Sequence, residues 1–160
     1  EGSLTHRDSM GTSETLGRGA VQFMTAGTGV RHSEHNLDGS RPLRFIQMWI
    51  TPRAGGLPPN YGSHETTAEQ RRNQWCRLAG PVPGAGADAG AAPVQLNQDA
   101  TIRVAEVDAG VVLPLSVPAG RQAYLLCMEG GARDPASGEA LERHDAAEIK
   151  AGCDLGLTAG

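Results

Sequence analysis

The chain has 160 residues, 39% of them hydrophobic and 20% charged, and a formal net charge of −4, which describes one ordinary globular domain or two small ones. The charge is unevenly divided, with six Arg against five acidic residues in positions 1–62 and eight basic against thirteen acidic residues in the remainder, and no basic cluster could neutralise a run of phosphates. Direct nucleic-acid binding is therefore not expected, and without a run of about 18 apolar residues the sequence predicts no membrane-spanning segment.

The first third of the chain reads as short strands separated by glycine-containing turns. The predicted strands are "SLTHRD" (3–8), "TSETL" (12–16), "AVQFMTA" (20–26), "VRHSEH" (30–35) and "LRFIQMWIT" (43–51). Turns at about this spacing are typical of antiparallel sandwiches and barrels. Because 43–51 is apolar on both faces, we expect it to be the most buried strand.

The middle of the chain is richer in Pro and Gly. We interpret 52–73 as a connection with one short helical turn near "TTAEQRR" (66–72), and "QWCRL" (74–78) as a return to strand. The low-complexity run "GPVPGAGADAGAAP" (80–93) has little to bury, so it predicts an exposed, mobile loop.

The last third is again β-type. Its predicted strands lie within 94–110, 111–117, 122–130, 144–152 and 155–160. The Ala, Leu and Glu content of "PASGEALERHD" (135–145) would suit a helix, but its Pro-x-x-Gly turn between two β-type runs favours a hairpin. Three widely spaced cysteines form no C-x-x-C pair, which indicates a reducing, cytoplasmic compartment.

Metal-binding side chains gather in "TAGTGVRHSEHN" (25–36). Alternate side chains of a strand share a face, so His32, Glu34 and Asn36 point one way and His35 the other. A neutral imidazole and a carboxylate at i and i+2 can hold a divalent ion between them, and mixed His/carboxylate shells suit non-haem iron and similar metals. The alternative for so short a motif is a hydrogen-bonded His and Glu on a solvated strand.

Three successive motifs bear a family resemblance. "THRDSMG" (5–11), "QFMTAGTGVRHSEHN" (22–36) and "QMWITP" (47–52) resemble the pirin family of cupin barrels, whose bacterial members include quercetin dioxygenases; "NQDATIRVAEVDAG" and "GRQAYLLCMEGG" are similar to the second barrel of short pirins. The resemblance implies an all-β bicupin that is incomplete at both ends. Residues 1–73 would belong to the first, metal-binding barrel and the connection, and 74–160 to a second barrel without ligands.

The resemblance also implies a site. A pirin shell of three His and one Glu takes two His from an upstream H-x-H motif, which would lie before residue 1, and the other two ligands match His32 and Glu34. Glu34 would also act as the base for the substrate. The cofactor implied is one divalent transition metal, Fe(II) first, with Ni, Mn, Cu, Zn or Co as alternatives, and the substrates are a flavonol such as quercetin and O2. The full-length protein would be a dioxygenase, and 1–160 alone inactive.

Other readings stay open. A pirin-like chain could instead be a non-enzymatic regulator, a metal-sensing partner of transcription or metabolic proteins. His6 is expected to be structural, and His64 and His144 have no partner pattern. The apolar side chains near the site are candidate pocket walls, although core packing is the preferred interpretation; they are Phe23, Met24, Phe45, Met48 and Trp49.

Overall fold

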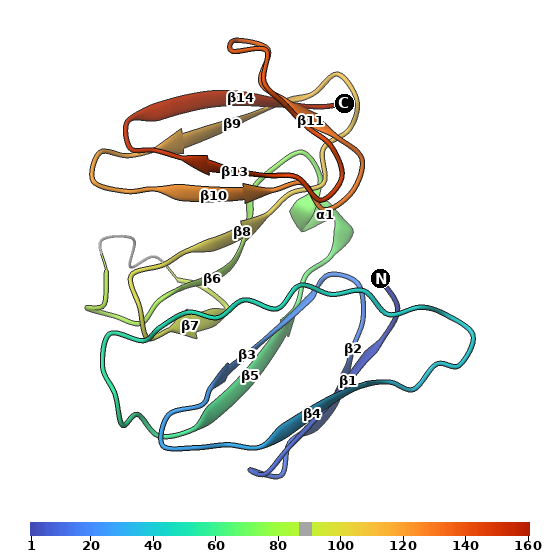
Figure 1. The fold of residues 1–160 in the computed structure, drawn as a ribbon, viewed down its shortest axis with the longest axis vertical. Helices are drawn as coiled ribbons and strands as arrows, with labels where there is room; N and C mark the ends of the chain where they lie inside the picture. Colours follow the sequence, from blue (N-terminus) through green and yellow to red (C-terminus); the bar gives the residue numbers. More distant parts are fainter. Residues whose placement is uncertain (87–90) are drawn as a thin grey trace. The chain divides into compact units, whose positions relative to one another are not determined.

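The computed structural model describes residues 1–86 and 91–160, and its regular structure is almost entirely β (Figure 1). The chain packs as two compact units, which we call the first unit (1–70 with 76–104) and the second unit (71–75 with 105–160). The predicted all-β class is therefore confirmed. Within the described ranges, no helix has the length and apolar character needed to cross a membrane.

The described residues of the first unit form three small sheets. In the first sheet, β1 lies between β2 and β4; in the second, β3 pairs with β5; in the third, β6 lies between β7 and β8. The bounds are β1 Leu4–Asp8, β2 Ser13–Leu16, β3 Ala20–Thr25, β4 His32–Asn36, β5 Asn60–Glu65, β6 Cys76–Pro81, β7 Val94–Leu96 and β8 Ile102–Val104. In the first sheet, Leu4 lies opposite Leu16, and both side chains are buried.

The second unit is built from two antiparallel sheets, one pairing β10 with β13 and the other ordered β12-β11-β14-β9. The bounds are β9 Val112–Val117, β10 Ala123–Leu126, β11 Ala132–Arg133, β12 Ala140–Leu141, β13 Ala146–Ile149 and β14 Cys153–Ala159. On β9, the buried Leu113 and Val117 and the half-buried Leu115 alternate with exposed residues, as expected for a sheet with one solvated face. The predicted hairpin at 135–145 is present as β11 and β12.

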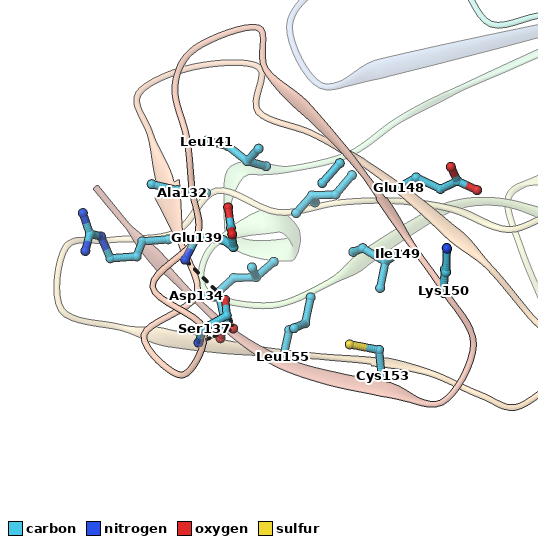
Figure 2. A pocket seen from close by; sticks show the side chains of 15 residues that line it. Ala132, Asp134, Ser137, Glu139, Leu141, Glu148, Ile149, Lys150, Cys153 and Leu155 are labelled. Carbon is cyan, nitrogen blue, oxygen red and sulfur yellow. Dashed lines mark hydrogen bonds between the residues drawn. The ribbon is translucent and has the colours of Figure 1, made fainter.

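A cavity of about 360 Å³ lies within the second unit, among β10 to β14 (Figure 2). Most of its lining is apolar, and the Asp134 carboxylate in it accepts hydrogen bonds from the Ser137 backbone N–H and hydroxyl. These bonds hold the pKa of the Asp134 carboxyl below its ordinary value. Asp134 thus fixes the turn between β11 and β12 rather than presenting a free carboxylate.

The prediction for 43–51 is wrong. This segment is not a strand, and Phe45, Met48 and Trp49 are exposed, Trp49 by 92%. Its ends are tied down: the Arg44 and Glu1 backbones exchange hydrogen bonds, and Arg53 N–H donates to the Asn97 carbonyl. Between those ties, the backbone of 45–50 makes no hydrogen bond to another backbone group of the described residues, so its apolar side chains have no sheet in which to be buried.

Two further differences concern the middle of the chain. β5 forms inside the predicted connection 52–73, because "NYGSHE" pairs with β3 although it carries little apolar character. The single turn α1 (Ala68–Arg71) matches the helical turn expected near 66–72. β6 extends to Pro81 into the predicted loop 80–93, of which 87–90 lie outside the described residues.

The division into barrels at 73/74 stays a prediction. By packing, the segment 76–104 belongs to the first unit, whereas the sequence analysis assigned it to the second barrel. The reason is local: β6 pairs with β7 and β8, and the side chain of Asn97 just beyond β7 donates to the Thr25 hydroxyl at the end of β3.

Candidate metal centre

His32 and Glu34 lie on the same face of β4. In the pairing of β1 with β4, His6 is opposite Glu34 and Asp8 is opposite His32, so these four side chains share one face of the sheet. His35 lies on the other face. The arrangement of β4 thus follows the alternation of its sequence, with His32 exposed and Glu34 half-buried.

The Glu34 carboxylate is held by two amides. Gln22 Nε2 donates to Oε1 at 2.5 Å, and Gln47 Nε2 lies 3.5 Å from Oε2, a much weaker contact. A carboxylate offers about four lone-pair positions, so these two bonds leave room for a further ligand. The Gln22 bond fixes the carboxylate while keeping it able to coordinate.

His6 is buried beside the pair, with 1% of its surface exposed. Its Nε2 lies 3.1 Å from Asp8 Oδ2, and its Nδ1 has no hydrogen-bond partner. Burial tends to raise the pKa of Asp8, but bonds from His6 and from the Thr12 and Met10 backbone outweigh it and hold that pKa below its ordinary value. His6 is therefore held on β1 by Asp8, whose other carboxylate oxygen binds the turn that follows, in keeping with a structural role for His6.

A network of side-chain hydrogen bonds joins β2, β3 and β5. The Tyr61 hydroxyl lies 2.8 Å from Glu14 Oε2 and 3.0 Å from Gln22 Oε1, and the Ser63 hydroxyl donates to Glu14 Oε1 at 2.7 Å. The phenol has one hydrogen, so it serves one of its two neighbouring oxygens at a time. Gln22 connects this network to Glu34, because its Nε2 donates to the Glu34 carboxylate.

We expect Tyr61 to make the stability of the first unit depend on alkaline pH. Burial raises the pKa of Tyr61 above the ordinary value of about 10, and the hydrogen bond and charge of Glu14 raise it further. The unfolded chain then loses this proton at a lower pH than the folded chain, so the contribution to stability is complete below pH of about 10 and is lost as the pH rises further. We expect Tyr61→Phe to lose less stability than the parent between pH of about 9 and 11 in urea unfolding. Equal losses would contradict this assignment.

The remaining histidines lie apart from the pair. His64 is opposite Val21 on β5, one position along from Ser63 and hence on the other face of that sheet. His144 belongs to the second unit, in the turn before β13, with a positive φ of 77°. Of the candidate pocket walls, Phe23 on β3 lies opposite Gly62 on β5. The Phe23 ring packs so closely on Gly62 that a Cβ added at Gly62 would meet it.

Sequence reasoning missed Glu14, Gln22 and Tyr61 as parts of this site. Gln22 and Gln47 both occur in the motifs that carry the resemblance, and that was the available signal. Tyr61 gave none, because it lies 39 residues beyond Gln22 and becomes its neighbour only through the pairing of β3 with β5.

The donor types fit a first-row transition metal, but their number is short. His32 offers an imidazole and Glu34 a carboxylate, and across the described residues no group of three or more His, Cys, Asp or Glu side chains is arranged to hold a metal ion. Tight sites for such metals use three or four protein ligands. The pair can therefore fill two positions of a shell and does not make a complete centre.

Two family models match the chain. The model described as Pirin matches residues 1–50, and the model described as Quercetinase C-terminal cupin domain matches residues 85–160. Among solved structures, the bacterial pirin YhhW of Escherichia coli in complex with nickel(II) superimposes with a TM-score of 0.83 at 24% identity, covering 99% of this chain and 64% of that one. The quercetin 2,3-dioxygenase of Acinetobacter baumannii gives a TM-score of 0.70 at 21% identity, covering 99% of this chain and 58% of that one.

The fold is thus that of the all-β cupin proteins. Among curated proteins, a pirin-like protein of Caulobacter vibrioides is 32% identical over 159 residues, 99% of this chain and 65% of the relative, and the quercetin 2,3-dioxygenase of E. coli K12 is 44% identical over 72 residues, 45% of this chain and 28% of that enzyme. The chain belongs to the pirin family. It spans 53% of the length of the relatives from Pseudomonas aeruginosa and Zymomonas mobilis.

Proposed function

We propose that this chain supplies His32 and Glu34 to the metal site of a pirin, and that the longer protein is a flavonol dioxygenase of the quercetin 2,3-dioxygenase type. The observation that carries the proposal is the pair itself. His32 and Glu34 share one face of β4, and they stand in the motif that resembles the family's later ligand pair. The remaining two ligands would be the histidines of an H-x-H segment upstream of residue 1.

The metal is proposed as a divalent transition ion, Fe(II) first, with nickel supported by the complex of the E. coli pirin. Bound at this pair, it would supply Lewis-acid activation of the flavonol 3-hydroxyl and of the reaction with O2. The chain's own groups act around it. His32 and Glu34 would hold the ion, Gln22 fixes the Glu34 carboxylate, and Glu34 would accept the proton of the substrate hydroxyl.

The small number of potential metal ligands favours a second candidate function. With two donors in place among the described residues, a regulatory or protein-binding pirin that senses a metal weakly would need no complete centre. This alternative shares the fold and the pair, and it differs in predicting no turnover of a flavonol.

Metal binding by two versions of the protein tests the proposal. Residues 1–160 and a version extended upstream by a segment with H-x-H are dialysed with Ni²⁺ or, without air, Fe²⁺, and the bound metal is then measured. We expect the short chain to retain little metal and to turn over no quercetin, and the extended chain to retain about one ion and to consume quercetin and O2. Loss of two coordinating ligands should cost more than the roughly 10–100-fold typical of losing an outer partner.

Stoichiometric metal on the short chain would contradict the ligand assignment and point to a donor outside the pair. Metal retention by the extended chain without consumption of quercetin would favour the regulatory alternative.

A further inference from the structure

Tyr61 contacts two side chains, Gln22 and His6, that each contact one member of the candidate pair. It lies opposite Met24 in the pairing of β3 with β5, two residues from the Gln22–Ser63 pair and on the same face of that sheet. Two separate lines of contact run from it, one of hydrogen bonds and one of stacked rings.

The first line runs through an amide to Glu34. The Tyr61 hydroxyl is 3.0 Å from Gln22 Oε1, and Gln22 Nε2 is 2.5 Å from Glu34 Oε1. While the phenol donates its one hydrogen to Gln22 Oε1, the amide cannot rotate its nitrogen away from the carboxylate without losing that bond. Tyr61 thereby restricts the orientation of Glu34 without contacting it.

The second line runs through His6 to His32. The rings of Tyr61 and His6 stack with centroids 4.5 Å apart and planes at 20°, and His6 stacks on His32 at 5.7 Å and 21°. These distances are in the range of favourable offset ring pairs. His6 is itself fixed by Asp8, so the stack gives the exposed His32 ring a rigid surface to lie against.

Tyr61 is well anchored for such a role. Its hydroxyl is 2.8 Å from Glu14 Oε2, and Ser63 binds the other oxygen of that carboxylate. Because burial and Glu14 raise the pKa of Tyr61, the phenol remains a hydrogen-bond donor throughout the neutral range.

We propose that Tyr61 is a positioning residue for His32 and Glu34 together, orienting the carboxylate through Gln22 and the imidazole through His6. This inference rests on the proposed function only in naming the pair as metal ligands; the positioning itself is a property of the metal-free chain. Residues that hydrogen-bond or pack against a metal-coordinating side chain typically set its orientation, and the loss of one such residue costs roughly 10–100-fold in metal affinity or activity.

Two substitutions separate the lines. Tyr61→Phe keeps the ring and removes the hydroxyl, whereas Tyr61→Leu removes both. In residues 1–160 without metal, we expect Tyr61→Phe to move the NMR signals of the Gln22 side-chain amide and to leave those of the His6 and His32 rings, while Tyr61→Leu moves all three. Tyr124→Phe, at an exposed tyrosine of the second unit, is the matched control and should move none.

The affinity measurement uses Ni²⁺ and the version extended by H-x-H. We expect about a 10-fold loss for Tyr61→Phe and a larger loss, up to about 100-fold, for Tyr61→Leu, with no change for Tyr124→Phe. If Tyr61 acts through Gln22, then Gln22→Ala and the double variant with Tyr61→Phe should lose the same factor rather than the product of two. Gln22→Ala also tests this line if Tyr61→Leu fails to fold.

Unchanged Gln22 and His32 signals in both Tyr61 variants would overturn the inference. So would additive losses in the double variant, because Tyr61 would then act by another route. If His32→Ala leaves Ni²⁺ affinity unchanged, the proposed function fails, and the NMR result still decides whether Tyr61 positions the two side chains.

Discussion

Metal binding by the version extended with H-x-H is expected to fall to background when either His32 or Glu34 is replaced by alanine. Each substitution removes one of the proposed coordinating atoms, so the proposed shell of four would keep three ligands and an open position. The loss should exceed the roughly 100-fold upper range for outer partners. Turnover of quercetin should fall with the metal, and in Glu34→Ala it should also lose the group that accepts the substrate proton.

His35→Ala is the matched control. His35 is an exposed imidazole three residues from His32, on the opposite face of the same strand. Its removal should leave metal stoichiometry and turnover unchanged. If His35→Ala reduces both as strongly as His32→Ala, the face assignment is wrong. Turnover that persists in both His32→Ala and Glu34→Ala would refute the ligand assignment altogether.

The part of the site that lies on one strand could be predicted from the sequence. The alternation of β4 depends only on backbone geometry, so the common face of His32 and Glu34 follows from their spacing. The turns before and after β2 and β3 were marked by glycines, and the structure uses positive φ at Gly11 and Gly19 there.

The parts that depend on distant pairing could not be predicted. β5 has the sequence "NYGSHE", whose strand character comes from pairing with β3 rather than from apolar alternation. Without that pairing, nothing places Tyr61 beside Gln22 or His6. The contacts of Tyr61 with Gln22 and His6 therefore could not be predicted from the residues of each segment taken separately.

The prediction of a buried strand at 43–51 was wrong for the opposite reason. Its composition predicts a buried strand strongly, because apolar residues occupy both faces. Burial, however, requires a partner surface as well as apolar side chains, and across the described residues no strand pairs with 45–50. The apolar composition of 43–51 was correctly recognised, but the sequence did not show that 45–50 would have no strand to pair with among the described residues.

The exposed apolar segment should make residues 1–160 associate in solution. Phe45, Ile46, Met48, Trp49 and Ile50 are between 37% and 92% exposed and follow one another along the chain. Burying each such side chain in a contact between molecules is favourable by roughly 1.5–3 kcal/mol, and an extended segment with unpaired backbone groups can also pair with a second copy. We expect sedimentation velocity to show concentration-dependent association, and Phe45→Ser with Trp49→Ser to shift the protein to monomer.

Tyr124→Ser provides the comparison for that experiment, because Tyr124 is 74% exposed but isolated on a strand of the second unit. Scattered exposed apolar residues are normal on protein surfaces, whereas contiguous ones mark interaction sites. Tyr124→Ser should therefore leave the association unchanged. If the parent remains monomeric at high concentration, or if Tyr124→Ser dissociates it as well as the double variant does, the segment 45–50 does not drive association.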